Sequence, residues 1–201
     1  MVQYSAAPSG AAGGDLGGTY PNPTLANAAQ IAGPGRQSLL GWNYDSEAAA
    51  GTFLHVSGTL YMHKIYIPAA ATISNILIGV TTGGSTLTAG QNLVGLYNAA
   101  GSRVAVSTDQ SAAWATSGAK SCALTAAYAA AVGVYWVGVL SVGTTPITAA
   151  VSNGFRAAYE AGVSGATLRH GANATGQTSM PASVTLASNG STSASTWVGL
   201  N

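Results

Sequence analysis

The sequence predicts an all-β fold, a single antiparallel β-sandwich of the jelly-roll type preceded by an extended N-terminal arm, and three observations lead to this prediction. From Leu39 onward, short apolar runs alternate with clusters of Gly, Ser, Thr and Asn, the spacing of strands and turns in a sandwich. Residues 1–36 hold small residues, Gly and Pro with almost no large apolar side chains, so they cannot bury a core. A chain of 201 residues suffices for one well-buried core. We therefore expect an assembly arm over 1–36 and a β-sandwich domain over 37–201.

Five stretches of the domain are its clearest strands. They are 60–67, 72–80, 91–97, 132–141 and 195–200. Within the second, Ile76, Ile78 and Val80 recur at every second position, which places one face of the strand against a core. Segment 132–140 is apolar on both faces, as in a strand covered on both sides, so we expect it in the middle of a sheet.

Two further segments complete the assignment. Segment 92–106 has the pattern of strand, short turn and strand, because Asn98 and Gly101 tolerate the positive φ of a tight turn. We expect a β-hairpin there. The Ala-rich segment 123–131 could form a helix, but it has no amphipathic stripe and lies between strands, so we reject the helix.

Charged residues are rare in this chain, at 5 % of the sequence, against about 25 % in ordinary soluble proteins. Ser, Thr, Asn, Gln and Gly must therefore hydrate the surface, which suits a protein that works outside a cytosol. The formal net charge of +1 provides little repulsion between copies, so we expect self-association. The six Lys and Arg residues are scattered along the chain, which argues against nucleic acid as a partner.

Neither export by a signal peptide nor membrane insertion is expected. Residues 1–4 lack the basic start and the apolar segment of a secretory signal. No stretch approaches the roughly 18 apolar residues of a membrane-spanning helix. The single cysteine, Cys122, lies in an apolar stretch and is interpreted as a small buried side chain, and it can form no intrachain disulfide.

The sequence contains no recognisable catalytic or metal-binding pattern. Of its five carboxylates, only Asp45 and Glu47 could share a strand face, and we interpret them as a solvated pair rather than a glycosidase dyad. His55, His63 and His170 lack the spacing of metal ligands, and we interpret each as a surface or hydrogen-bonded residue. Nucleophile-elbow and phosphate-loop motifs are missing as well. We expect no enzymatic activity, no metal and no cofactor.

Aromatic residues in or beside polar, Gly-rich segments are the candidates for ligand binding, because an exposed amphipathic ring can stack on a sugar. These residues are Trp42, Tyr44, Trp114, Tyr159 and Trp197. The alternative is that they cap the ends of the sandwich core. We take the first four as candidate ligand contacts. Tyr135 and Trp136, which lie in the expected central strand, are assigned to the core.

The arm contains the run GGDLGGTYPNPTL at 13–25. Its prolines fix their own φ and force the preceding residues into extended conformations, while its glycines allow close backbone approach. Several copies could therefore pack around an axis, with Leu16, Tyr20 and Leu25 buried against symmetry mates; a stiffened linker is the alternative. The candidate assembly contacts are Asp15, Leu16, Tyr20, Pro21, Pro23 and Leu25.

This run resembles a short element of bacteriophage tail fibres and related receptor-binding or minor tail proteins. Segments 64–68, 87–97 and 143–146 are also similar to a C-terminal domain of such proteins. The resemblance implies a homotrimeric, non-enzymatic virion protein that is made in the host cytoplasm and displayed on the virion surface. It further implies that the arm contacts other virion proteins and that the β-domain meets the host surface, with a saccharide as the ligand class.

Two alternatives remain open from the sequence. The chain could be a capsid decoration protein or head fibre whose arm grips the shell, which its small size favours because many tail fibres carry long shafts. It could also be a depolymerase acting on host polysaccharide, although no catalytic residues support that hypothesis.

Overall fold

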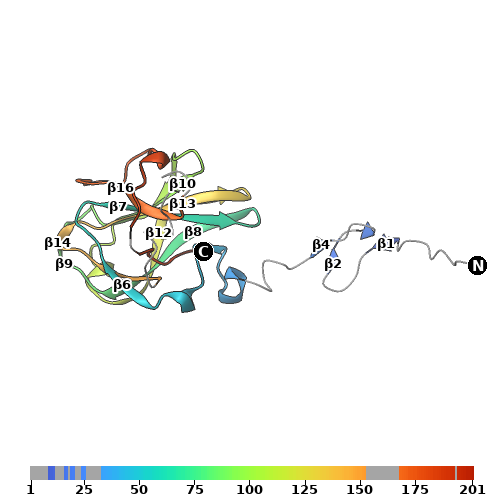
Figure 1. The fold of residues 1–201 in the computed structure, drawn as a ribbon, viewed down its shortest axis with the longest axis horizontal. Coiled ribbons are helices and arrows are strands. Elements are labelled where there is room, and N and C mark those ends of the chain that lie inside the picture. Colours follow the sequence, from blue (N-terminus) through green and yellow to red (C-terminus); the bar gives the residue numbers. More distant parts are fainter. Residues whose placement is uncertain are drawn as a thin grey trace, which may run out of the picture.

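The computed structural model describes residues 9–11, 16–17, 19–20, 24–25, 33–152, 168–192 and 194–201. The candidate contacts Asp15, Pro21, Pro23 and Tyr159 lie outside these residues. At Leu16, Tyr20 and Leu25 the structure describes the backbone only. The described part of the chain is all-β and antiparallel, and its helical segments are short 3-10 turns, so the predicted fold class is confirmed (Figure 1).

Two large antiparallel sheets make up most of the described domain. The first has the order β11-β10-β13-β7-β16, with β7 (Leu60–Ile67), β10 (Leu93–Asn98), β11 (Arg103–Val106), β13 (Gly133–Leu140) and β16 (His170–Ala174). The second has the order β5-β17-β8-β15-β6, with β12 also paired to β8. Its strands are β5 (Gly41–Trp42), β6 (Gly51–Leu54), β8 (Ala71–Thr82), β12 (Gly118–Ala130), β15 (Thr148–Val151) and β17 (Val198–Leu200).

Short elements complete the domain. Strands β9 (Ser85–Leu87) and β14 (Gly143–Thr145) pair as a separate ribbon. The 3-10 turns are η1 (Pro34–Gln37), η2 (Ser46–Ala48), η3 (Ala113–Ala115) and η4 (Leu186–Ser188).

The main core lies between the two sheets. From β8 it receives Ile76, Ile78 and Val80, the face predicted from their period-two spacing, and it faces Val137 and Val139 of β13. Cys122 of β12 is buried in the same cluster, as predicted. Burial raises the pKa of its thiol to about 11.

A second core covers the other face of the first sheet. Trp136 and Leu140 of β13 pack there with Leu60 of β7 and Met180 of the C-terminal segment. Strand β13 is the middle strand of its sheet and is covered on both faces, which confirms the prediction for 132–140. The second core leaves one end of this face of the first sheet uncovered. At that end Tyr66 of β7 and Val134 of β13 are cross-strand partners, and their side chains are 56 % and 40 % exposed.

The two local assignments also hold, with one difference in detail. Strands β10 and β11 form the predicted hairpin. Gly101 has the positive φ, 82°, whereas Asn98 stabilises the turn by accepting hydrogen bonds from the N–H groups of Ala100 and Ser102, each at 3.0 Å. Segment 123–130 is part of strand β12, not a helix.

The backbone of the arm pairs with itself. Strand β1 (Gly10–Ala11) pairs with β3 (Thr19–Tyr20), and β2 (Leu16–Gly17) pairs with β4 (Thr24–Leu25), both antiparallel. The described parts of the arm therefore fold back within one chain rather than running fully extended. Packing of the arm around a symmetry axis stays a prediction.

Among the described residues, no helix is long and apolar enough to cross a membrane.

Candidate functional site

Two pockets share Trp42 of strand β5, and the first of them also borders strand β7. The first, of about 200 Å³, is lined by Trp42, Asn43, Lys64, Ile65, Tyr66, Val134 and Arg169. The second, of about 320 Å³, is lined by Arg36, Gln37, Trp42, Asp45 and Glu47. We call these lining residues together the Trp42 surface.

Strand β5, an edge strand of the second sheet, holds Trp42 in place beside strand β7. Trp42 is opposite Gly199 in the ladder with β17. The preceding residue is Gly41, where an added Cβ would lie only 3.1 Å from the carbonyl oxygen of Tyr66, so the missing side chain lets β5 approach β7 closely. Half-buried Trp42 is thereby held beside the exposed Tyr66 end of the first sheet.

The chain after Trp42 is tied to the C-terminal strand. Asn43 donates a hydrogen bond to the carbonyl of Thr196 at 2.7 Å and accepts one from the N–H of Val198 at 3.0 Å. Tyr44 donates through its hydroxyl to the carbonyl of Ser195 at 2.9 Å, and its own carbonyl accepts from the indole of Trp197 at 3.1 Å. These bonds preorganise the loop that carries the aromatic residues, which reduces the ordering cost of binding.

Two cations meet in the first pocket although they are far apart in the sequence. The N–H of Lys64 donates to the carbonyl of Arg169 at 2.7 Å, and the guanidinium of Arg169 donates to the carbonyl of Asn43 at 2.8 Å. The ammonium of Lys64 lies 4.8 Å from the ring centroid of Trp136, a cation–π arrangement. Burial, and then the charge of Arg169, lower the pKa of Lys64.

The two carboxylates of the second pocket lie on a 3-10 turn. Asp45 is the N-cap of η2 and accepts a hydrogen bond from the N–H of Glu47 at 3.0 Å. Gln37 and Ser46 exchange hydrogen bonds of 2.8 and 3.0 Å, which fix this turn against η1. Our expectation that the pair could share a strand face is therefore wrong, because the Asp45 side chain caps a turn instead. Both residues are exposed, as expected of a solvated pair.

The Trp42 surface gathers much of the chain's sparse charge. It contains three of the six Lys and Arg residues and two of the five Asp and Glu residues. In the sequence these charges are scattered, and only the pairing of β7 with β16 and the approach of β5 to β7 bring them together. Lys64, Tyr66 and Arg169 were not among our candidates, and nothing in their spacing pointed to them.

The aromatic residues predicted as ligand contacts differ in how far they are buried. Trp42 and Tyr44 are half-buried at the surface, where a ligand can reach part of the ring. Trp114 is fully buried in the main core, because η3 turns it inward, so it is a core residue and not a ligand contact. Trp197 is also buried, and Tyr135 and Trp136 belong to the cores as predicted.

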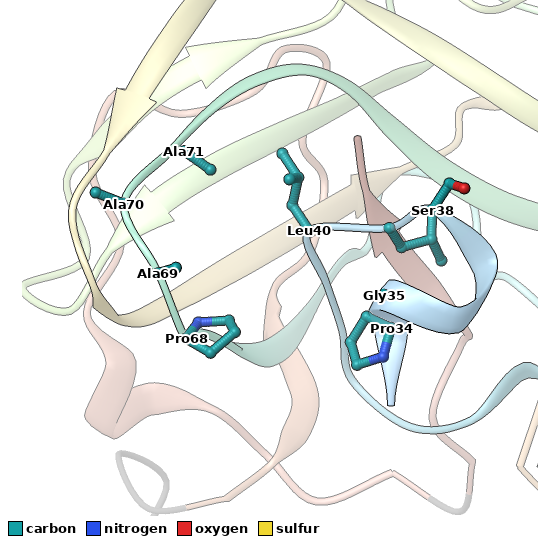
Figure 2. A pocket seen from close by; sticks show the side chains of 9 residues that line it. Pro34, Gly35, Ser38, Leu40, Pro68, Ala69, Ala70 and Ala71 are labelled. Atoms are coloured by element: carbon teal, nitrogen blue, oxygen red, sulfur yellow. The ribbon is translucent and has the colours of Figure 1, made fainter. Parts of the chain in front are cut away.

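A larger pocket, of about 450 Å³, lies where the domain begins at η1. Figure 2 shows that its lining is apolar or small except for Ser38, with Leu40 and Pro34 facing Pro68 and Ala71 across it. None of its described lining residues has a titratable side chain, so the lining offers mainly apolar packing.

The three histidines are buried and hydrogen-bonded around the segment 192–196. His55 contacts the hydroxyl of Thr196 at 3.1 Å, His63 that of Ser195 at 3.4 Å, and His170 the carbonyl of Thr192 at 3.1 Å. The hydrogen-bonded interpretation is confirmed, and the surface interpretation is wrong. Across the described ranges, no three His, Cys, Asp or Glu side chains are grouped so as to hold a metal ion.

Burial keeps two of these histidines neutral at pH 7. It lowers the pKa of His55 to about 3. It also lowers the pKa of His63 well below its usual range, with smaller contributions from the neighbouring His170 and His55. This end of the sandwich is therefore built around uncharged imidazoles.

No protein-family model matches this sequence, and no curated protein is significantly similar to it.

Proposed function

We propose that this chain is a non-enzymatic structural protein of a bacteriophage virion, a tail-fibre or minor tail component that binds a host-surface saccharide through the Trp42 surface. The observation that carries the binding role is the placement of Trp42 between two pockets lined by charged and amide side chains. Saccharide recognition needs an apolar ring to cover the C–H face of a sugar and nearby polar groups to bind its hydroxyls. Trp42 and Tyr66 supply the rings, and Gln37, Asp45 and Glu47 supply polar groups.

The arrangement of the carboxylates favours binding over hydrolysis. A glycosidase places two carboxyl groups on opposite sides of the scissile bond. Asp45 and Glu47 instead lie two residues apart on one exposed turn, and Asp45 accepts a hydrogen bond from the backbone of Glu47. This surface can hold a sugar by hydrogen bonds, but it does not bracket a glycosidic bond.

The virion setting rests on the resemblance of the run 13–25 and of the domain segments to phage fibre proteins. We expect a homotrimer displayed on the virion surface, with the arm contacting other virion proteins. A chain of low charge with two-stranded ladders in its arm fits such an attachment role. Antibody labelling of the particle separates a tail position from the alternative of a capsid decoration protein.

The binding role is tested with purified protein and a broad panel of intact bacteria. We expect wild-type protein to bind at least one strain, and Trp42→Ala and Tyr66→Ala to lose most of that binding. Leu54→Ala is the matched control, because Leu54 is 54 % exposed on β6, at the opposite edge of the second sheet from β5. Absence of binding across the whole panel, or equal loss in all three variants, would contradict the proposal.

A further inference from the structure

The two pockets of the Trp42 surface differ in charge. Among the lining residues that the structure describes, the pocket with Tyr66 and Val134 has two cations, Lys64 and Arg169, and no carboxylate. The pocket on the other side of Trp42 is lined by one cation, Arg36, and by two carboxylates. A ligand that spans Trp42 therefore meets a positive field at one end and hydrogen-bond acceptors at the other.

The lining of the cationic pocket combines apolar and aromatic side chains with the two charges. Tyr66 and Val134 are direct cross-strand partners, and both are exposed. On the same face of β7, the Lys64 ammonium lies over the ring of Trp136, which is itself buried. A flat sugar ring can therefore lie against Tyr66 and Val134 while its charged substituent reaches Lys64 and Arg169.

The electrostatics of this pocket favour an anion. The ammonium of Lys64 is partly desolvated and lies near the guanidinium of Arg169, and both effects lower its pKa, so its charged form is held at a cost. A bound anion would offset that cost. A hydrogen bond of 2.8 Å to the carbonyl of Asn43 anchors the Arg169 guanidinium, and its planar fork suits a carboxylate or a phosphate.

We propose that the saccharide bound at this surface is acidic, with a carboxylate or phosphate group held between Lys64 and Arg169 and its ring over Trp42 and Tyr66. The adjacent sugar unit then directs hydroxyl groups to Asp45 and Glu47. This inference rests on the proposed saccharide-binding function and specifies its ligand class.

The test is calorimetric titration of the full-length protein with three soluble polymers at low ionic strength. These are a polyuronate, a glycerol-phosphate polymer and neutral dextran of similar length. We expect at least one acidic polymer to bind tenfold or more tightly than dextran, and which of the two does so identifies the anionic group. Added salt weakens that binding, because ion pairs at an exposed site are screened.

Matched variants assign the effect to the two cations. Lys64→Met keeps the apolar stem over Trp136 and removes the charge, and Arg169→Gln keeps a donor. Each should weaken acidic-polymer binding about tenfold or more, the usual effect of losing a hydrogen bond to a charged group. Lys120→Met makes the same change on β12, outside both pockets, and should leave binding unchanged.

The outcomes separate this inference from the proposed function. If dextran binds as tightly as both acidic polymers, or if the two variants keep the acidic preference, the acidic-ligand inference is wrong while saccharide binding stands. Cell binding that depends on Trp42 without any affinity for the acidic polymers also overturns it. Failure to bind both cells and polymers refutes the proposed function as well.

Discussion

Acidification from pH 6.5 to 4.5 should destabilise the sandwich through its buried histidines. The folded-state pKa of His55 is about 3, below the 6.5 of an unfolded histidine. The unfolded chain therefore binds a proton below pH 6.5 that the folded chain excludes, so stability is full above that pH and falls below it. His63 acts in the same direction, because burial also lowers its pKa.

The magnitude follows from linkage. Each pH unit between the unfolded and folded pKa values costs about 1.4 kcal/mol per histidine, so His55 alone removes about 3 kcal/mol between pH 6.5 and 4.5. That is a large fraction of the stability of a typical domain. The range from pH 6.5 to 4.5 lies mostly above the pH at which Asp and Glu ordinarily titrate, so the histidines dominate the loss of stability in this range.

Urea unfolding measured at several pH values tests this, with the fluorescence of buried Trp114 and Trp136 as the signal. His55→Gln is the informative variant, because a Gln amide can replace the ring nitrogen that contacts Thr196 and does not titrate. Between pH 6.5 and 4.5, the free energy of unfolding of this variant should fall by about 3 kcal/mol less than that of the wild-type protein. Identical pH dependence in both proteins, or a gain of stability on acidification, would refute the reasoning.

Three further predictions concern two glycine turns, the arm and the buried cysteine. Gly90→Ala should lower the free energy of unfolding by about 1 kcal/mol, because Gly90 has φ 77° with open space around it. Gly101→Ala should lower it clearly more, because at φ 82° an added Cβ would also lie 2.2 Å from the carbonyl oxygen of Val184. Equal midpoints in urea for the two variants would show that the steric argument fails. Light scattering should find a trimer for the full chain and a smaller species for a chain starting at Gln37, and a monomer in both cases would exclude assembly through the arm. The thiol of Cys122 should react with a disulfide reagent only after unfolding, because it is buried and its pKa is raised to about 11; rapid reaction of the native protein would contradict its placement.

Local patterns in the sequence were sufficient for the fold class. Strand β8 is recognisable because Ile76, Ile78 and Val80 recur at every second position, and one buried face requires that period. Strand β13 is recognisable because a strand covered on both sides needs apolar residues at successive positions. Each of these patterns is contained within a few consecutive residues, so no knowledge of distant contacts is needed to interpret it.

The candidate site was decided by tertiary structure. Lys64 and Arg169 are neighbours only because residue 169 pairs with β7, and Trp42 joins them only because Gly41 lets β5 approach that strand. Trp114 occurs in a polar segment like Trp42, yet the η3 turn buries it. The histidines are buried because β7, β16 and the residue after β6 all contact the C-terminal segment. The sequence by itself predicted the fold class and the longest apolar strands with their buried faces, since these depend on neighbouring residues, but it did not identify short strands such as β5, β6, β15 and β16. Only the folded chain determined which polar and aromatic side chains share a surface, since that depends on the pairing of residues more than a hundred positions apart.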